Sequence, residues 1–212
     1  MGHIIHVKLD QEALGYSDEQ ILNFIKDSVY HVTEKKPEWN NRVRDMLEGW
    51  EKINTMDKWS SNDGPAVPGT YALVWDEAYD VTHPILWNRT FIFGESTRAM
   101  WHRLQTHHVA LRGKTSNMSE KYRKHLPSIN RWAKVDITKN LDKVAIWARP
   151  HRVSDLDYQY DRDHSVFMEK QAHAFYEALW GHGPIANTRD KPDYSLILKC
   201  KAFLTEAGYQ TK

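Results

Sequence analysis

The sequence predicts an α+β fold in which a small β-sheet is flanked by helices. Two β-rich runs, 69–75 and 90–93, are bounded by Pro, Gly, Asn and Asp, a pattern typical of paired strands. A third β-rich run covers 141–149, and residues 1–9 suit an edge strand. Apolar residues at helical spacing precede, separate and follow the three main runs, so we expect helices to pack against their sheet.

Two amphipathic helices are predicted before the first main strand. A capping box that begins at Ser17 precedes an apolar stripe over residues 21–32, and residues 39–53 carry a second stripe. We expect both stripes to be buried. Residues 60–68 are rich in Ser, Asn, Asp, Gly and Pro and are expected to form a linker. Residues 1–65 are therefore predicted to be a separate helical region.

The remaining helices are predicted from apolar spacing and from residues that begin or end helices. One begins near Arg98 and has Met100, Leu104 and His107 on one face. Another covers residues 120–132 and is interrupted at Pro127. After an acidic, Tyr-rich loop at 155–163, two more helices are expected over 165–180, with Gly181 as the C-cap, and over 195–207.

Composition places the chain among folded, non-membrane proteins. It has 212 residues, 41% of them hydrophobic, and nine Trp, enough for one good core. No apolar run reaches the roughly 18 residues that a membrane span needs. Cys200 is the single cysteine, which excludes an intramolecular disulfide and favours a reducing compartment such as the cytoplasm.

Charge is distributed unevenly along the chain. Residues 98–152 hold 13 Lys and Arg against 3 acids, a local balance of +10, whereas the whole chain carries +1. A basic block in a near-neutral protein is typical of a surface that binds a polyanion. Arg98, Arg112 and Lys114 are candidate substrate contacts within it. A solvated helical face of mixed charge is the alternative explanation.

Three side chains are candidates for chemistry before any family is considered. Glu169 lies beside the apolar stripe of its predicted helix, where a carboxylate could be half-buried and face a cleft. Arg103 and His107 are four residues apart and so project from one helix face. An arginine in that position can hold a phosphate through two parallel hydrogen bonds. Taken singly, each is equally compatible with an ordinary surface residue.

The order of these residues resembles the GIY-YIG endonuclease superfamily, and within it the phage endonucleases and the type II restriction enzymes. The resemblance covers residues 67–190 and rests on Gly69-Thr70-Tyr71, Ile92-Phe93-Gly94, Arg103, Glu169 and Asn187. It implies a three-stranded antiparallel sheet with the two tripeptides on its first two strands. It also implies a nuclease core over 66–190, followed by a C-terminal helix over 191–212.

The resemblance implies a role for each matching residue. Gly94 matches the glycine of the second tripeptide and contacts substrate, and Glu169 matches the metal ligand. The other implied catalytic residues are Tyr71, Arg103, His107, Lys121 and Asn187, with Lys114 as the rival of Lys121. Ile92 stands where the family has its second signature tyrosine, and the spacing from Gly94 to Arg103 is one residue longer than usual.

The implied function is a metal-dependent endonuclease that hydrolyses phosphodiester bonds in double-stranded DNA. One Mg²⁺ or Mn²⁺ ion per active site would bind Glu169, and the cell would be bacterial or phage-infected. We expect a homodimer or higher homo-oligomer, with residues 1–65 dimerising or clamping DNA. Which of Tyr71, Lys121 or His107 activates water is left open. The alternatives are a DNA-binding protein without catalysis and a His-rich metallohydrolase.

Overall fold

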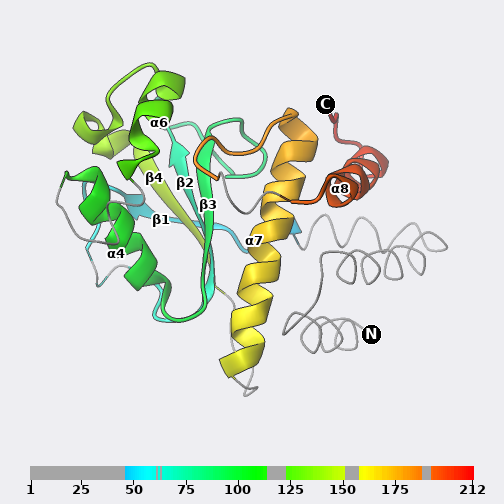
Figure 1. Cartoon of the computed structure of the whole chain (residues 1–212), viewed down its shortest axis with the longest axis horizontal. Helices are drawn as coiled ribbons and strands as arrows, with labels where there is room; N and C mark the ends of the chain where they lie inside the picture. The colour runs from blue at the N-terminus through cyan, green and yellow to red at the C-terminus, as the bar shows by residue number, and fades with distance from the viewer. Residues whose placement is uncertain (1–45, 61, 63, 114–122, 151–157, 188–191) are drawn as a thin grey trace.

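A four-stranded antiparallel sheet lies at the centre of the molecule (Figure 1). The computed structural model describes residues 46–60, 62, 64–113, 123–150, 158–187 and 192–212. The strands are β1 (Glu51–Thr55), β2 (Gly69–Trp75), β3 (Thr90–Ser96) and β4 (Val144–Pro150), in the order β1-β4-β2-β3. The hairpin of β2 and β3 therefore occupies one side of the sheet, and β3 forms its edge.

The sequence correctly predicted an α+β class and three of these strands, but the expected number of three strands was wrong. The fourth, β1, begins within residues 39–53, which apolar spacing had assigned to a helix, and continues to Thr55. Gly49 has a φ of +80°, a left-handed conformation that ends a right-handed helix, and the chain then extends and pairs with β4. The sheet therefore includes part of the region 1–65 that the sequence had set apart. Residues 1–45 lie outside the described residues.

Helices cover both faces of the sheet (Figure 1). On one face lie α4 (Met100–Leu111) and α6 (Leu126–Ala133), and on the other lie α7 (Tyr158–Trp180) and α8 (Tyr194–Glu206). Two 3-10 turns, η1 (Ile137–Lys139) and η2 (Leu141–Lys143), lead into β4. Within the described ranges, no helix has both the length and the apolar character needed to cross a membrane.

Two predicted helix boundaries were wrong. Pro127 was expected to interrupt a helix, but it lies in the first turn of α6, where a proline costs no hydrogen bond. Residues 158–163, expected to belong to an acidic loop, form the first turns of α7. The predicted C-cap is confirmed, since Gly181 has a φ of +77° directly after α7.

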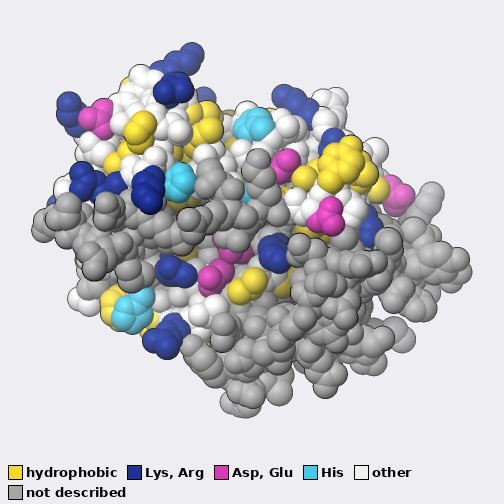
Figure 2. Space-filling view, viewed as in Figure 1, with side chains coloured by type: hydrophobic (Ala, Val, Ile, Leu, Met, Phe, Trp, Pro, Cys, Tyr) yellow, Lys and Arg dark blue, Asp and Glu magenta, His cyan; other side chains and the backbone are white. Residues whose placement is uncertain are grey.

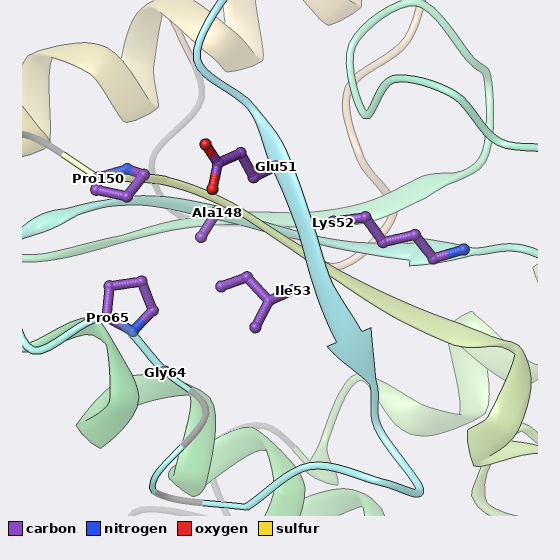
Figure 3. A pocket seen from close by; sticks show the side chains of 7 residues that line it. All are labelled: Glu51, Lys52, Ile53, Gly64, Pro65, Ala148 and Pro150. Atoms are coloured by element: carbon purple, nitrogen blue, oxygen red, sulfur yellow. The ribbon is translucent and has the colours of Figure 1, made fainter.

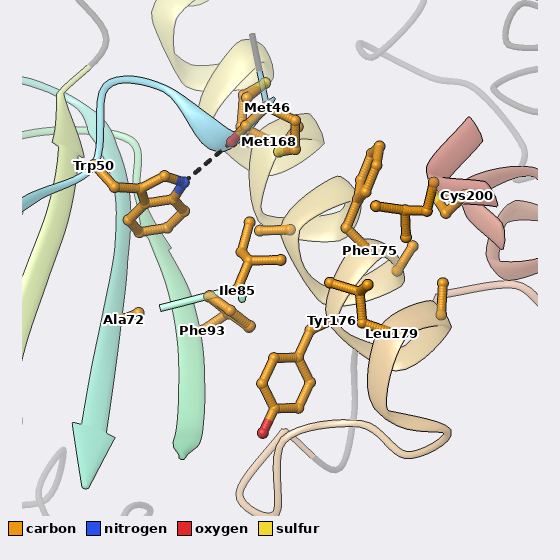
Figure 4. Packing of buried hydrophobic residues seen from close by; sticks show 14 of the residues in the cluster. Met46, Trp50, Ala72, Ile85, Phe93, Met168, Phe175, Tyr176, Leu179 and Cys200 are labelled. Atoms are coloured by element: carbon orange, nitrogen blue, oxygen red, sulfur yellow. Dashed lines mark hydrogen bonds between the residues drawn. The ribbon is translucent and has the colours of Figure 1, made fainter. Parts of the chain in front are cut away.

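Strand alternation divides the core into two clusters, one on each face of the sheet. Ala72 and Phe93 point toward α7 and α8, where Figure 4 shows them with Phe175, Tyr176 and Trp50. Tyr71, Leu73 and Ile92 point toward α4 and α6. The phenol of the first signature tripeptide and the side chains of α7 are therefore on opposite faces of the hairpin.

The segment predicted to be a linker fixes the start of α4. Ala99 provides no side-chain cap for this helix. Instead the backbone N–H of Met100 donates to the carbonyl of Val67 at 3.1 Å, and that of Trp101 donates to Pro65 at 3.4 Å. These bonds satisfy donors that a helix start leaves unpaired, and they set the direction in which α4 leaves the sheet.

Candidate active site

The first part of the candidate site is a contact between β2 and β3. Tyr71 on β2 pairs with Gly94 on β3, directly across the hairpin. A Cβ atom on residue 94 would lie 2.3 Å from the Tyr71 hydroxyl oxygen, far inside van der Waals contact. The absence of a side chain on Gly94 therefore makes room for the phenol ring. The residue type at position 94 decides where the Tyr71 hydroxyl can lie.

The second part is the partner of that hydroxyl. The Tyr71 hydroxyl oxygen is 2.8 Å from Nε2 of His107, and the two rings meet edge to face. His107 is only 2% exposed. Burial, and secondarily the positive charge of Arg103, lowers the pKa of His107 from 6.5 to about 3. The imidazole is therefore neutral at neutral pH. It is better suited to act as a hydrogen-bond partner of Tyr71 than as a general base.

Arg103 lies one helical turn before His107 on α4, as the i,i+4 spacing predicted. Its Nη2 atom is 3.7 Å from Oε1 of Glu95, and the side chains are 38% and 19% exposed respectively. Sequence reasoning missed Glu95, although one signal was visible: a carboxylate directly after Gly94. The structure thus brings Tyr71, Gly94, Arg103 and His107 together, and adds an acid to them.

Glu169 lies on α7, across the sheet from Tyr71, and is half-buried as predicted. One turn earlier, the Ser165 carbonyl accepts a hydrogen bond of 3.4 Å from the hydroxyl of Thr70. Thr70 is the cross-strand partner of Glu95. Glu169 therefore lies on the turn of α7 that follows the contact with β2.

Figure 2 shows acidic side chains between the positions of α4 and α7, with Lys and Arg side chains on both sides of them. Acids and bases are therefore interspersed at the edge of the sheet that β3 forms, between the two helices that flank it.

Asn187 is held at the outer edge of β3. Its side-chain Oδ1 accepts a hydrogen bond from the Phe93 N–H at 2.8 Å, and its Nδ2 donates to the Phe93 carbonyl at 2.7 Å. The N–H of Ala186 donates to the carbonyl of Phe91. In this way residues 186–187 act as a short substitute for a neighbouring strand. Asn187 therefore fixes the backbone next to Gly94.

The basic candidates are distributed around α4 and α6, and Figure 2 shows Lys and Arg side chains over both helices. Arg98 is exposed just before α4. Arg112 is exposed at the other end of α4, where its guanidinium donates to the carbonyl of Asp57 at 2.8 Å. Lys114 and Lys121 lie outside the described residues.

A metal ion would find few protein ligands here. Among the described residues, no group of three His, Cys, Asp or Glu side chains could hold one. Two carboxylates are the candidate donors, Glu95 on β3 and Glu169 on α7, and carboxylates are hard oxygen ligands. Such a donor set suits Mg²⁺, which takes one or two carboxylates and keeps several waters. It does not suit a multi-histidine zinc site.

A pocket of about 280 Å³ lies elsewhere, beside β1 (Figure 3). Figure 3 shows Glu51 and Ile53 on the side of the strand that faces Pro65 and Pro150, and Lys52 on the opposite side. None of the predicted site residues lines this pocket.

Comparison of the chain with protein-family models, with curated proteins and with solved structures finds no match.

Proposed function

We propose that this chain is a metal-dependent endonuclease of the GIY-YIG type that hydrolyses phosphodiester bonds in double-stranded DNA. The observation that carries the proposal is the packing of Tyr71 against Gly94. In this position the Tyr71 hydroxyl forms a hydrogen bond with the buried, neutral imidazole of His107. His107 holds this phenol, and Arg103 lies one helical turn from His107, an arrangement that suits phosphoryl chemistry. The basic surface over α4 and α6 supports a polyanionic substrate.

Tyr71 is the candidate for orienting the attacking water, and the proton that the water loses as it attacks the phosphorus would pass to solvent. The neutral His107 fixes the direction of the hydroxyl, and its low pKa opposes transfer of the proton to the imidazole. The positive charge of Arg103 is close enough to lower the pKa of His107, so it also adds to the positive potential near the Tyr71 hydroxyl. Tyr71 is 3% exposed, so only a small part of its surface can meet a substrate. Lys121 remains a second candidate for helping this step.

Arg103 is the candidate for binding the reacting phosphate. A guanidinium presents its donors in a fixed fork that matches two phosphate oxygens. Its charge would be worth more as negative charge develops on those oxygens, because a partly buried cation is weakly screened. Asn187 contributes by fixing β3 at Phe93, and so the position of Gly94.

Glu169 would hold the metal ion, with water and phosphate oxygens completing its coordination. When bound, the ion supplies Lewis-acid stabilisation of the phosphate and the leaving oxygen. The half-burial of Glu169 suits this role, because a carboxylate partly removed from water binds a cation more strongly than an exposed one.

A plasmid nicking assay tests the proposal. The purified chain should convert supercoiled DNA to nicked or linear forms with Mg²⁺ or Mn²⁺, and EDTA should stop the reaction. Tyr71→Phe keeps the ring against Gly94 and removes only the hydroxyl, so we expect cleavage to fall by about 10²-fold or more. Wild-type chain that neither binds nor cuts DNA would refute the proposal.

A DNA-binding protein without catalysis is the second candidate, and a specific observation favours it. Ile92 stands at the position of the second signature tyrosine, and its side chain is 7% exposed within the apolar cluster beside α4. Metal-independent DNA binding without any nicking would support this alternative and exclude the first.

A further inference from the structure

The ion pair between Glu95 and Arg103 is a feature to which the resemblance assigns no role. Glu95 comes from β3, and its cross-strand partner Thr70 contacts α7, so its position belongs to the α7 face of the hairpin. Arg103 comes from α4, on the opposite face. The pair therefore meets at the edge of β3 and joins the two sides of the candidate site.

Partial burial makes this pair stronger than an ordinary surface pair. The Glu95 side chain is 19% exposed and the Arg103 side chain 38%, with 3.7 Å between Nη2 and Oε1. Attraction between charges that are partly withdrawn from water is screened less than attraction on the open surface. Even so, more than a third of the arginine remains accessible, so an incoming anion can reach it.

We propose that Glu95 is a positioning residue: in the unbound protein it holds the Arg103 guanidinium beside Gly94, and it competes with a DNA phosphate for that guanidinium. The inference rests on the proposed function. It follows from charge balance, because Arg103 carries a single positive charge. While the carboxylate neutralises that charge, Arg103 adds little to phosphate binding, and full contact with a phosphate requires the carboxylate to withdraw.

Glu95→Gln separates the charge of this residue from its shape. The glutamine side chain has nearly the same size and shape as glutamate, but the negative charge is gone. In EDTA, we expect Glu95→Gln to bind a DNA duplex about 5- to 10-fold more tightly than the wild type. Arg103 would then neutralise one more phosphate, so the log–log slope of affinity against salt should steepen by about 0.9.

A double-mutant cycle makes the inference specific to the pair. Fluorescence anisotropy with a labelled duplex would measure the wild type, Glu95→Gln, Arg103→Gln and the double variant at several salt concentrations. In the Arg103→Gln background, Glu95→Gln should change affinity less than twofold and leave the slope unaltered. Glu95→Ser, a second variant without the charge, should repeat the gain of Glu95→Gln and guards against a folding defect in one variant.

A matched control exists at the other end of the same hairpin. Glu77 and Arg89 form a pair at 3.9 Å with side chains 54% and 47% exposed. Glu77→Gln removes the same charge from the protein but lies away from Arg103, so we expect less than a twofold change in affinity and no change in slope. A gain equal to that of Glu95→Gln would show that net charge alone explains the effect and would overturn the proposal.

Other outcomes also decide the matter. If Glu95→Gln tightens binding equally without Arg103, or leaves affinity and slope unchanged, the competition does not exist. If the wild type binds no DNA, the proposed function fails. The inference about Glu95 can then be tested with inorganic pyrophosphate, whose binding is measured from the NMR signal of the Arg103 Nε–Hε group. Tighter pyrophosphate binding in Glu95→Gln than in the wild type would then sustain the inference, and equal binding would overturn it.

Discussion

Acid should destabilise this protein through His107, and the size of the effect follows from burial. The imidazole has a pKa of about 3 in the folded chain and an ordinary value of 6.5 when unfolded. Between pH 6.5 and pH 3, His107 is therefore protonated in the unfolded state and neutral in the folded state. Stability from this group is complete above pH 6.5 and is lost as the pH falls toward 3. Each pH unit in that window costs about 1.4 kcal/mol.

When the pH is lowered from 7.5 to 5.0, only about the last 1.5 units lie below the unfolded-state pKa of 6.5. The free energy of unfolding should therefore decrease by about 2 kcal/mol. Urea unfolding at both pH values would measure it, in the wild type and in His107→Gln. Carboxylates and other histidines titrate in both proteins, so their contributions cancel in the comparison. We expect the wild type to lose about 2 kcal/mol more than the variant over this interval.

His102→Gln is the matched control, because it removes an exposed imidazole from the same helix. It should show the same pH dependence of stability as the wild type. The NMR signals of the His107 ring should also show no titration between pH 8 and pH 5. Equal losses in wild type and His107→Gln, or a His107 titration midpoint near 6.5, would refute the burial of this imidazole behind Tyr71.

Three further predictions concern the site and the assembly. Gly94→Ala should destabilise the fold by about 1–3 kcal/mol, because the new Cβ would overlap the Tyr71 ring, and it should abolish cleavage; an unchanged urea midpoint would contradict this packing. Glu169→Gln should leave the circular dichroism spectrum and DNA binding intact and remove cleavage, whereas full activity would exclude Glu169 as the metal ligand. The full chain should be a dimer by light scattering, and a chain that begins at Met46, which keeps β1, should be a monomer; a full-length monomer that cuts both strands together would exclude the dimerising role proposed for the N-terminal region.

The sequence by itself determined the elements whose patterns are local. Alternation and turn residues located β2, β3 and β4, and apolar spacing located α4, most of α7, and α8. The i,i+4 spacing placed Arg103 and His107 on neighbouring turns of one helix. These predictions succeeded because hydrophobic periodicity and helix caps act over a few residues and need no knowledge of distant partners.

Tertiary structure alone decided what depends on pairing and enclosure. Residues 51–55 became β1 because β4 offered an edge to pair with, which no local pattern reveals. Packing across the hairpin places the Tyr71 ring where a Cβ atom on residue 94 would lie. Burial in the same packing lowers the pKa of His107. Glu95 and Arg103 form an ion pair because β3 and α4 lie close together at the β3 edge of the sheet. Asn187 bonds to Phe93, which is 94 residues away in the sequence. Distances between residues remote in sequence are set by the whole fold. The sequence therefore indicated candidate residues for this site, but not how they are arranged in space.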